Sequence, residues 1–141
     1  MQHCWRRMGR MWMAPLLFVA TSVFLWRYLG SVFVPTLLTR SVVALVPALS
    51  DLETLVSINT NLLYFGAYLA FAMFWPRLKQ YFRSPFLAGL ALWLVNVFIL
   101  FPAIGRGVLG YKLPQGWMAV SLPLLLSHWL FARGLGFQSR M

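Results

Sequence analysis

Residues 84–105 read SPFLAGLALWLVNVFILFPAIG and contain no charged side chain. An apolar run of about 20 residues is the length that an α-helix needs to cross the hydrocarbon core of a bilayer. Ser84 followed by Pro85 is typical of a helix start, in which serine caps the first turn and proline takes its first position. This stretch therefore predicts a transmembrane helix that begins at Ser84.

Three other uncharged runs predict further spans of the same kind. We expect four transmembrane helices in one transmembrane domain of residues 1–141, with the spans at residues 11–29, 52–76, 84–105 and 114–132. The composition agrees, because 61% of the residues are hydrophobic and 10% are charged, against about 45–50% and 25% in soluble domains. The predicted fold class is an all-α integral membrane bundle.

Local signals refine the boundaries of these helices. Ser50 and Glu53 have the spacing of a capping box, which would start the second helix and place both acidic residues of the chain at its positive end. Pro114 has the position of a first helical residue in the fourth helix. The turn after the third helix is marked by three glycines: Gly105, Gly107 and Gly110.

Residues 30–50 are apolar but are interrupted by Pro35, Arg40 and Pro47. As a fifth span they would hold Arg40 near mid-membrane, at a cost of about 3 kcal/mol. A fifth span would also reverse the sidedness of every later loop. We therefore expect an interfacial or re-entrant segment on the outer face, and a fifth span remains the alternative.

The distribution of Lys and Arg predicts the orientation, since cytoplasmic loops are enriched in both. The bias places both termini in the cytoplasm of a multi-pass protein, most simply in a bacterial inner membrane. The net charge is +10, but the cations stand in small separate groups, which favours anionic lipid headgroups as partners over nucleic acid. The predicted cytoplasmic cations are Arg6, Arg7, Arg10, Arg77, Lys79, Arg83, Arg133 and Arg140, and the outer ones are Arg27, Arg40, Arg106 and Lys112.

A polar stripe runs along the second predicted helix. Ser57, Asn61, Tyr64 and Tyr68 share one face, and polar side chains in a membrane prefer the interior of a bundle. Asn96 on the third helix lies at a depth similar to that of Asn61, so these two side chains could hydrogen-bond. The simplest interpretation is a set of interhelical contacts, and the alternative is a lining for a transported substrate.

The neighbouring face of this helix carries small residues. Asn59, Leu63, Gly66 and Ala70 follow one another at helical spacing, and Gly66 with Ala70 forms a small-xxx-small step that permits close helix approach. A polar path between mutually facing helices would favour a transporter. If the polar stripe of Ser57, Asn61 and Tyr64 instead faced outward, docking to a partner would be favoured.

His128 is an ionisable residue inside the fourth predicted span, and such residues are candidates for function. Its imidazole could ligate a haem or chlorophyll metal, relay a proton, or hydrogen-bond to a neighbour such as Tyr68. Haem often takes a second axial ligand, and the other histidine, His3, lies in the N-terminal tail. We therefore expect no cofactor and no metal site, with haem or (bacterio)chlorophyll at His128 as the alternative.

The residues of common catalytic sites are missing from the sequence. Asp51 and Glu53 are its only acidic residues, and both are assigned to a helix start, so no carboxylate pair remains for acid–base chemistry. The single cysteine, Cys4, precedes the first span and is expected to be an inert thiol. No nucleophile elbow, HExxH, CxxC or phosphate loop occurs. We expect that the protein is not an enzyme.

Two motifs in the C-terminal third carry a family resemblance. Residues 102–110 read PAIGRGVLG, a proline followed by spaced glycines, and residues 128–136 read HWLFARGLG, a histidine followed by an aromatic residue and a terminal Leu-Gly. In these motifs the chain resembles small four-helix bacterial inner-membrane proteins of the YagU-like type. Ala132 stands where that group tends to have glycine, and Arg133 is unusual for it. The resemblance implies a four-span fold and no particular activity.

These observations predict a non-catalytic integral membrane protein. We expect an accessory or structural subunit that packs against a larger membrane complex of respiratory or photosynthetic type. Its expected partners are other membrane subunits, or a second copy of itself, and lipids. Two alternatives remain: a small transporter or channel with a polar intramembrane path, and a subunit that holds haem or chlorophyll through His128.

Overall fold

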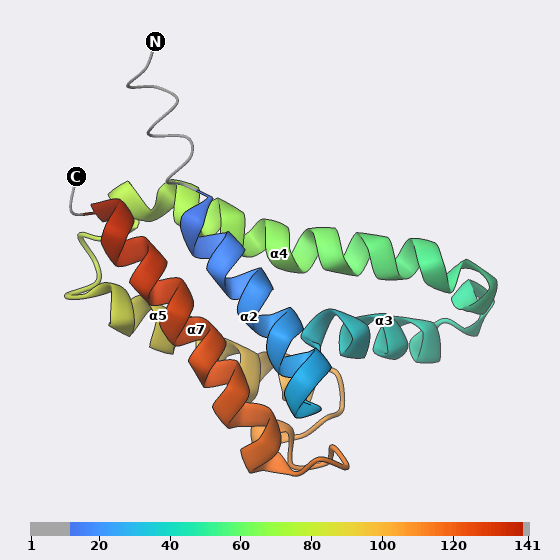
Figure 1. Cartoon of the computed structure of the whole chain (residues 1–141). Coiled ribbons are helices and arrows are strands. Elements are labelled where there is room, and N and C mark those ends of the chain that lie inside the picture. Colours follow the sequence, from blue (N-terminus) through green and yellow to red (C-terminus); the bar gives the residue numbers. More distant parts are fainter. Residues whose placement is uncertain (1–11, 140–141) are drawn as a thin grey trace.

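The computed structural model describes residues 12–139, which form helices joined by short turns and contain no strand (Figure 1). The all-α prediction is confirmed for this range. The predicted start of the first span at residue 11 lies outside it, as do His3, Cys4, Arg6, Arg7, Arg10 and Arg140. The α-helices are α2 (Met13–Leu29), α3 (Val34–Leu45), α4 (Glu53–Leu78), α5 (Pro85–Leu94), α6 (Phe101–Ala103) and α7 (Trp117–Ser139). The other helical segments are the 3₁₀ turns η1 (Pro47–Leu52) and η3 (Val108–Gly110) and the π-helix η2 (Val95–Leu100).

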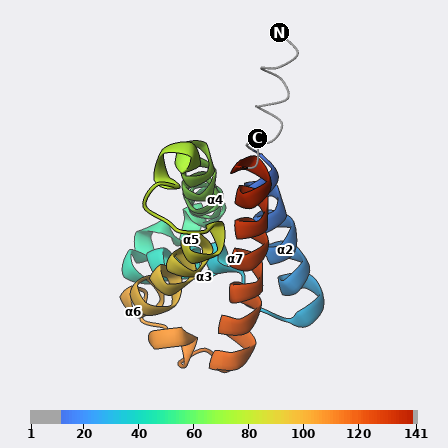
Figure 2. The ribbon, with the colours of Figure 1, turned by 90° about the vertical axis from the view of Figure 1, so that its left-hand side faces the viewer.

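The helices form a three-helix bundle and a hairpin. Helix α7 lies between α2 and α5 and packs extensively against both (Figure 2). Helix α3 pairs with the first half of α4 as a hairpin that extends away from this bundle, and α4 contacts α2 from Tyr64 onward (Figure 1). The start of α2, the end of α7 and the turn between α4 and α5 lie together at one end of the molecule.

Glycines let the bundle helices approach closely. A Cβ atom at Gly134 of α7 would lie 2.5 Å from the Cα atom of Ala14 in α2. A Cβ atom at Gly89 of α5 would lie 2.7 Å from the carbonyl oxygen of His128 in α7. Both distances are shorter than a real Cβ contact, so each contact between helices depends on glycine.

Three helical stretches are long and apolar enough to cross a membrane: Pro47–Leu78, Pro85–Ala103 and Trp117–Phe137. Helices α2 and α3 pass the same test together, but they are bent by 81° at the break between them. Gly30, with φ +62°, ends α2 in the left-handed conformation that glycine adopts readily. The described chain therefore has three or four segments that can span a membrane, as the uncharged runs predicted in outline.

The predicted capping box at Ser50 and Glu53 is wrong. Residues Pro47–Leu52 form a 3₁₀ turn, Leu52 precedes the first residue of α4, and no side chain caps that helix. Proline presets a helical φ and starts the turn early. Ser50 then lies inside the turn and does not take up the extended conformation of an N-cap.

The third helix starts as predicted, whereas the fourth does not. The hydroxyl oxygen of Ser84 accepts a hydrogen bond from the backbone N–H of Leu87. Helix α7 begins at Trp117 and not at Pro114, because Gly116 has φ +80° and a helix can begin only after it. It also continues past residue 132 to Ser139, with Arg133 exposed on its surface. The three glycines predicted to form the turn after the third helix all have positive φ.

Candidate functional site

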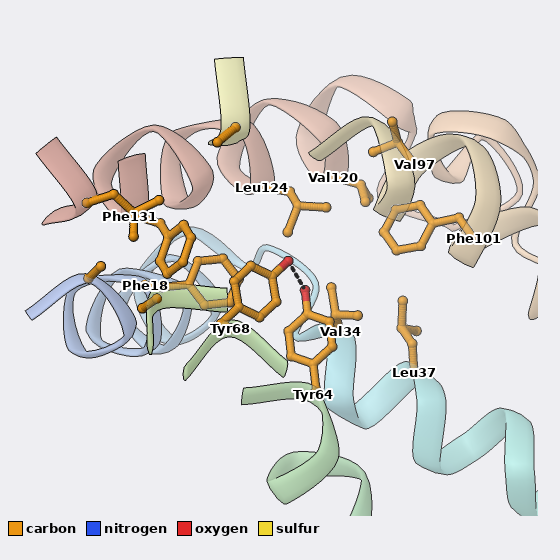
Figure 3. Packing of buried hydrophobic residues seen from close by; sticks show 14 of the residues in the cluster. Phe18, Val34, Leu37, Tyr64, Tyr68, Val97, Phe101, Val120, Leu124 and Phe131 are labelled. Atoms are coloured by element: carbon orange, nitrogen blue, oxygen red, sulfur yellow. Dashed lines mark hydrogen bonds between the residues drawn. The ribbon is translucent and has the colours of Figure 1, made fainter. Parts of the chain in front are cut away.

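Four polar side chains from three segments of the chain meet inside the molecule. Tyr64 and Tyr68 extend from α4, Asn96 from η2 and His128 from α7, and all four are buried. The Tyr68 hydroxyl lies 2.6 Å from Nε2 of His128, so the hydrogen bond considered for this pair is present. The Tyr64 hydroxyl donates to Oδ1 of Asn96 at 3.1 Å, and the two tyrosine hydroxyls lie 3.4 Å apart (Figure 3).

The hydrogen bonds of this network form a chain that runs from Tyr64 through Asn96 and Tyr68 to His128. The carbonyl oxygen of Leu124 can only accept, so Nδ1 of His128, 2.7 Å away, must carry the proton. The neutral ring then presents Nε2 as an acceptor for the Tyr68 hydroxyl. The amide of Asn96 donates to the Tyr68 hydroxyl at 2.9 Å and to the carbonyl oxygen of Leu92 at 2.8 Å. Every polar group of the network is thereby satisfied, as buried polar groups require.

The π-helix η2 carries Asn96 at the centre of the network. Its last turn closes with a hydrogen bond from the N–H of Phe101 to the carbonyl oxygen of Asn96, five residues earlier. Pro102 follows directly and has no N–H to continue the α-helical pattern. Single π-turns inside helices are frequent at functional sites, and here the turn accompanies the residue with the most hydrogen bonds in the network.

Aromatic rings enclose the network. The ring of Phe18 in α2 stacks on Tyr68, with the ring centroids 4.0 Å apart (Figure 3). It meets His128 and Phe131 edge to face. The small cavity that borders Tyr64 has a volume of only about 10 Å³, roughly enough for one water molecule. The network therefore holds helices together in a closely packed interior.

Two residues of the predicted polar stripe lie outside this network. The amide of Asn61 donates to the backbone carbonyl of Ser57 in its own helix at 2.8 Å. The predicted hydrogen bond between Asn61 and Asn96 is not formed. Asn61 lies on the half of α4 that pairs with α3, where Thr39 and Thr60 share a hydrogen bond of 2.6 Å. The stripe is thus divided between the hairpin and the bundle.

The stripe of small residues faces away from the rest of the molecule. Asn59, Leu63, Gly66 and Ala70 are all exposed, and they lie opposite the buried face of α4. A Cβ atom at Gly66 would meet nothing within 4 Å. Asn59 makes no side-chain hydrogen bond with any described residue. We call these four residues the outer stripe of α4.

Some residues of the site could not be singled out from the sequence. Phe18 is one of many aromatic residues in an apolar run, and nothing in that run marks it. Phe131 could have been found, because it lies three residues after His128 and so shares its face. Among the described residues, no three His, Cys, Asp or Glu side chains lie close enough together to hold a metal ion.

Comparison of the chain with protein-family models, curated proteins and solved structures gives no match. The resemblance to YagU-like proteins therefore stays a prediction. Function must be argued from the geometry of the network and the outer stripe.

Proposed function

We propose that the chain is a non-catalytic accessory subunit of a membrane complex, and that α4 is the helix that binds its partner. The observation that carries this proposal is the direction of the outer stripe. The inner face of α4 is used by the polar network, and the opposite face, with its small and polar residues, is exposed in the described chain. A small-xxx-small step on an exposed helix face is suited to docking with another helix.

Two other helix glycines support this interpretation of Gly66. Gly89 and Gly134 each touch a neighbouring helix so closely that a Cβ atom could not fit. Gly66 has the same helical setting but nothing beside it. A small-xxx-small step in a membrane typically receives another helix, and for Gly66 and Ala70 that helix would come from a partner.

Asn59 supports the proposal independently. It lies about 9 Å along α4 from Glu53, at 1.5 Å per residue, and its side chain is exposed. An amide that faces lipid has no hydrogen-bond partner, whereas one that faces another helix can find one. A polar residue and a small-xxx-small step on one exposed face are better suited to a helix partner than to lipid alone.

The arrangement of the helices supports a four-span placement. Phe18 of α2 packs on the second half of α4, and Thr39 of α3 pairs with its first half. In our proposal α2 and α3 therefore form one broken span beside α4, with the bend at Gly30. Four crossings, and not five, are consistent with the start of α2 and the end of α7 lying at the same end of the molecule.

Charge supports placing that end in the cytoplasm. The acidic side chains Asp51 and Glu53 both lie at the opposite end, beside η1 and the start of α4. By the positive-inside rule we propose that this end, with both termini, is cytoplasmic, and that the membrane is a bacterial inner membrane. The described cations at the proposed cytoplasmic end are Arg77, Lys79, Arg83 and Arg133.

Affinity purification of the tagged protein in mild detergent, read by mass spectrometry, tests the proposed function. We expect the wild-type chain to co-purify with a larger membrane subunit in fixed ratio. Gly66→Leu should abolish this without unfolding the chain, because no described atom lies where the new side chain begins. Ala20→Leu, a matched change at an exposed position of α2, should leave co-purification unchanged.

Two results would contradict the proposal. If the wild-type chain emerges alone from several mild detergents, it is not a subunit of a stable complex. If it emerges only as a homodimer that Gly66→Leu dissociates, the outer stripe binds a second copy and the accessory role is wrong.

The geometry gives less support to the two alternatives. A transport path would need Ser57 and Asn61 to continue into the network, but the Asn61 amide donates to the backbone carbonyl of Ser57 within α4. A haem or chlorophyll metal at His128 would need a free ring nitrogen, and both nitrogens have hydrogen-bond partners. If the purified wild-type protein showed the absorption band of a bound pigment, and His128→Leu removed that band, the cofactor alternative would be restored.

A further inference from the structure

An apolar groove runs between α5 and α7 on the surface of the bundle. It has a volume of about 430 Å³, within the range of roughly 300–1,000 Å³ that is typical of small-ligand sites. Its lining is entirely apolar: Phe86, Gly89, Leu90, Leu122, Leu125, Leu126 and Trp129.

The groove exists because two helices meet closely at a glycine. Gly89 forms part of its floor, with the backbone of α5 directly against α7. The lining residues of α7 extend from Leu122 to Trp129, which is about 10 Å along the helix axis. The groove therefore runs along the two helices, parallel to the direction that a lipid chain takes in a bilayer.

One end of the groove carries a positive charge. Phe86 and Trp129 close this end, with ring centroids 6.1 Å apart. The guanidinium of Arg133 lies over the Trp129 ring, 5.4 Å from its centroid. Arg133 is exposed, and the only acidic side chains of the chain lie at the other end of the molecule. This cation has no carboxylate side chain within the protein to neutralise it.

We propose that this groove binds an anionic phospholipid, with an acyl chain between α5 and α7 and the headgroup phosphate at Arg133. The groove supplies apolar surface for the chain, and arginine supplies a planar set of donors that suits a phosphate. Basic positions between transmembrane helices at the cytoplasmic side are a known setting for anionic lipids. The site depends on the membrane placement proposed above but not on an accessory role, since it lies on α5 and α7 and not on α4.

Native mass spectrometry of the protein in nanodiscs of phosphatidylcholine with a minor fraction of phosphatidylglycerol tests this site. We expect one phosphatidylglycerol to be retained per chain, and Arg133→Gln to weaken its binding about five-fold, the typical worth of one cation near an anionic surface. Leu126→Trp should fill the groove and weaken binding with all charges kept. Arg77→Gln is the matched control, because Arg77 is also an exposed cation near an aromatic ring at the same end of the molecule.

Three outcomes would overturn the lipid site. Equal losses from Arg133→Gln and Arg77→Gln would mean a general charge effect, and retention by Leu126→Trp would mean that the groove is not occupied. Retention of phosphatidylcholine equal to that of phosphatidylglycerol would mean that Arg133 does not select an anionic headgroup. Because co-purification of a protein partner does not depend on these residues, the lipid site and the accessory role can fail separately.

Discussion

The bundle of α2, α5 and α7 and the hairpin of α3 and α4 bury their surfaces to different extents. Half of the most apolar stretch of α7 is buried, but only 17% of the corresponding stretch of Pro47–Leu78 is. The bundle brings backbones together at Gly89 and Gly134, whereas the hairpin leaves Gly66 open. Helix α7 therefore completes more of its packing within the chain than α4 does. The hairpin offers surface that lipid or a partner must cover.

The largest expected effect comes from replacing glycine by leucine in each of these two settings and comparing the results. Gly134→Leu would drive a side chain into the backbone of Ala14 and should cost about 3 kcal/mol or more, since overpacking against backbone cannot relax easily. Gly66→Leu should change the unfolding free energy by less than about 1 kcal/mol and in the stabilising direction, because leucine favours a helix more than glycine does. Thermal unfolding of the two purified variants in the same detergent measures the difference. Similar melting temperatures would remove the distinction between bundle and hairpin.

A second, smaller effect should separate the network from the rest of the polar stripe. Asn96→Leu removes the partner of Tyr64 and one partner of Tyr68. We expect a loss of about 1–3 kcal/mol, the cost of leaving buried polar groups unsatisfied. Asn61→Leu, the matched control, removes only a hydrogen bond to its own helix and should cost less than about 0.6 kcal/mol. Unfolding in mixed micelles of increasing SDS content gives both values, and equal losses would mean that the network does not hold the helices together.

The smallest effect is expected inside the hairpin. Thr39→Val removes the hydrogen bond between Thr39 and Thr60 that joins α3 to α4. We expect a cost of about 0.6 kcal/mol, the average for such bonds in membranes, seen as faster hydrogen exchange in α3. Thr21→Val is the control, because Thr21 bonds only to the Leu17 carbonyl of its own helix. Unchanged exchange in α3 would mean that apolar packing alone holds the hairpin.

The sequence predicted the helical character, because it depends on local patterns, and it offered Tyr68 as one possible partner of His128 among several roles for that histidine. Uncharged length identifies a span, and an ionisable group in a membrane needs a nearby partner. The bend at Gly30 could not be predicted, since hydropathy measures how apolar a segment is and says nothing of its direction. Asn61 and Asn96 share a predicted depth, but α3 occupies the half of α4 that carries Asn61. Tertiary packing decides which neighbour a helix face meets. The spacing of residues along one helix carries no information about that neighbour.

The central claim is that the outer stripe of α4 contacts another membrane protein. The most direct test is photocrosslinking in the native membrane from a benzoylphenylalanine at Leu63, which is 75% exposed, compared with the same probe at Leu16 of α2, which is 59% exposed. The account predicts a discrete protein adduct from position 63 and none from position 16. Adducts of equal yield at both positions, or adducts with lipid alone at position 63, would contradict it.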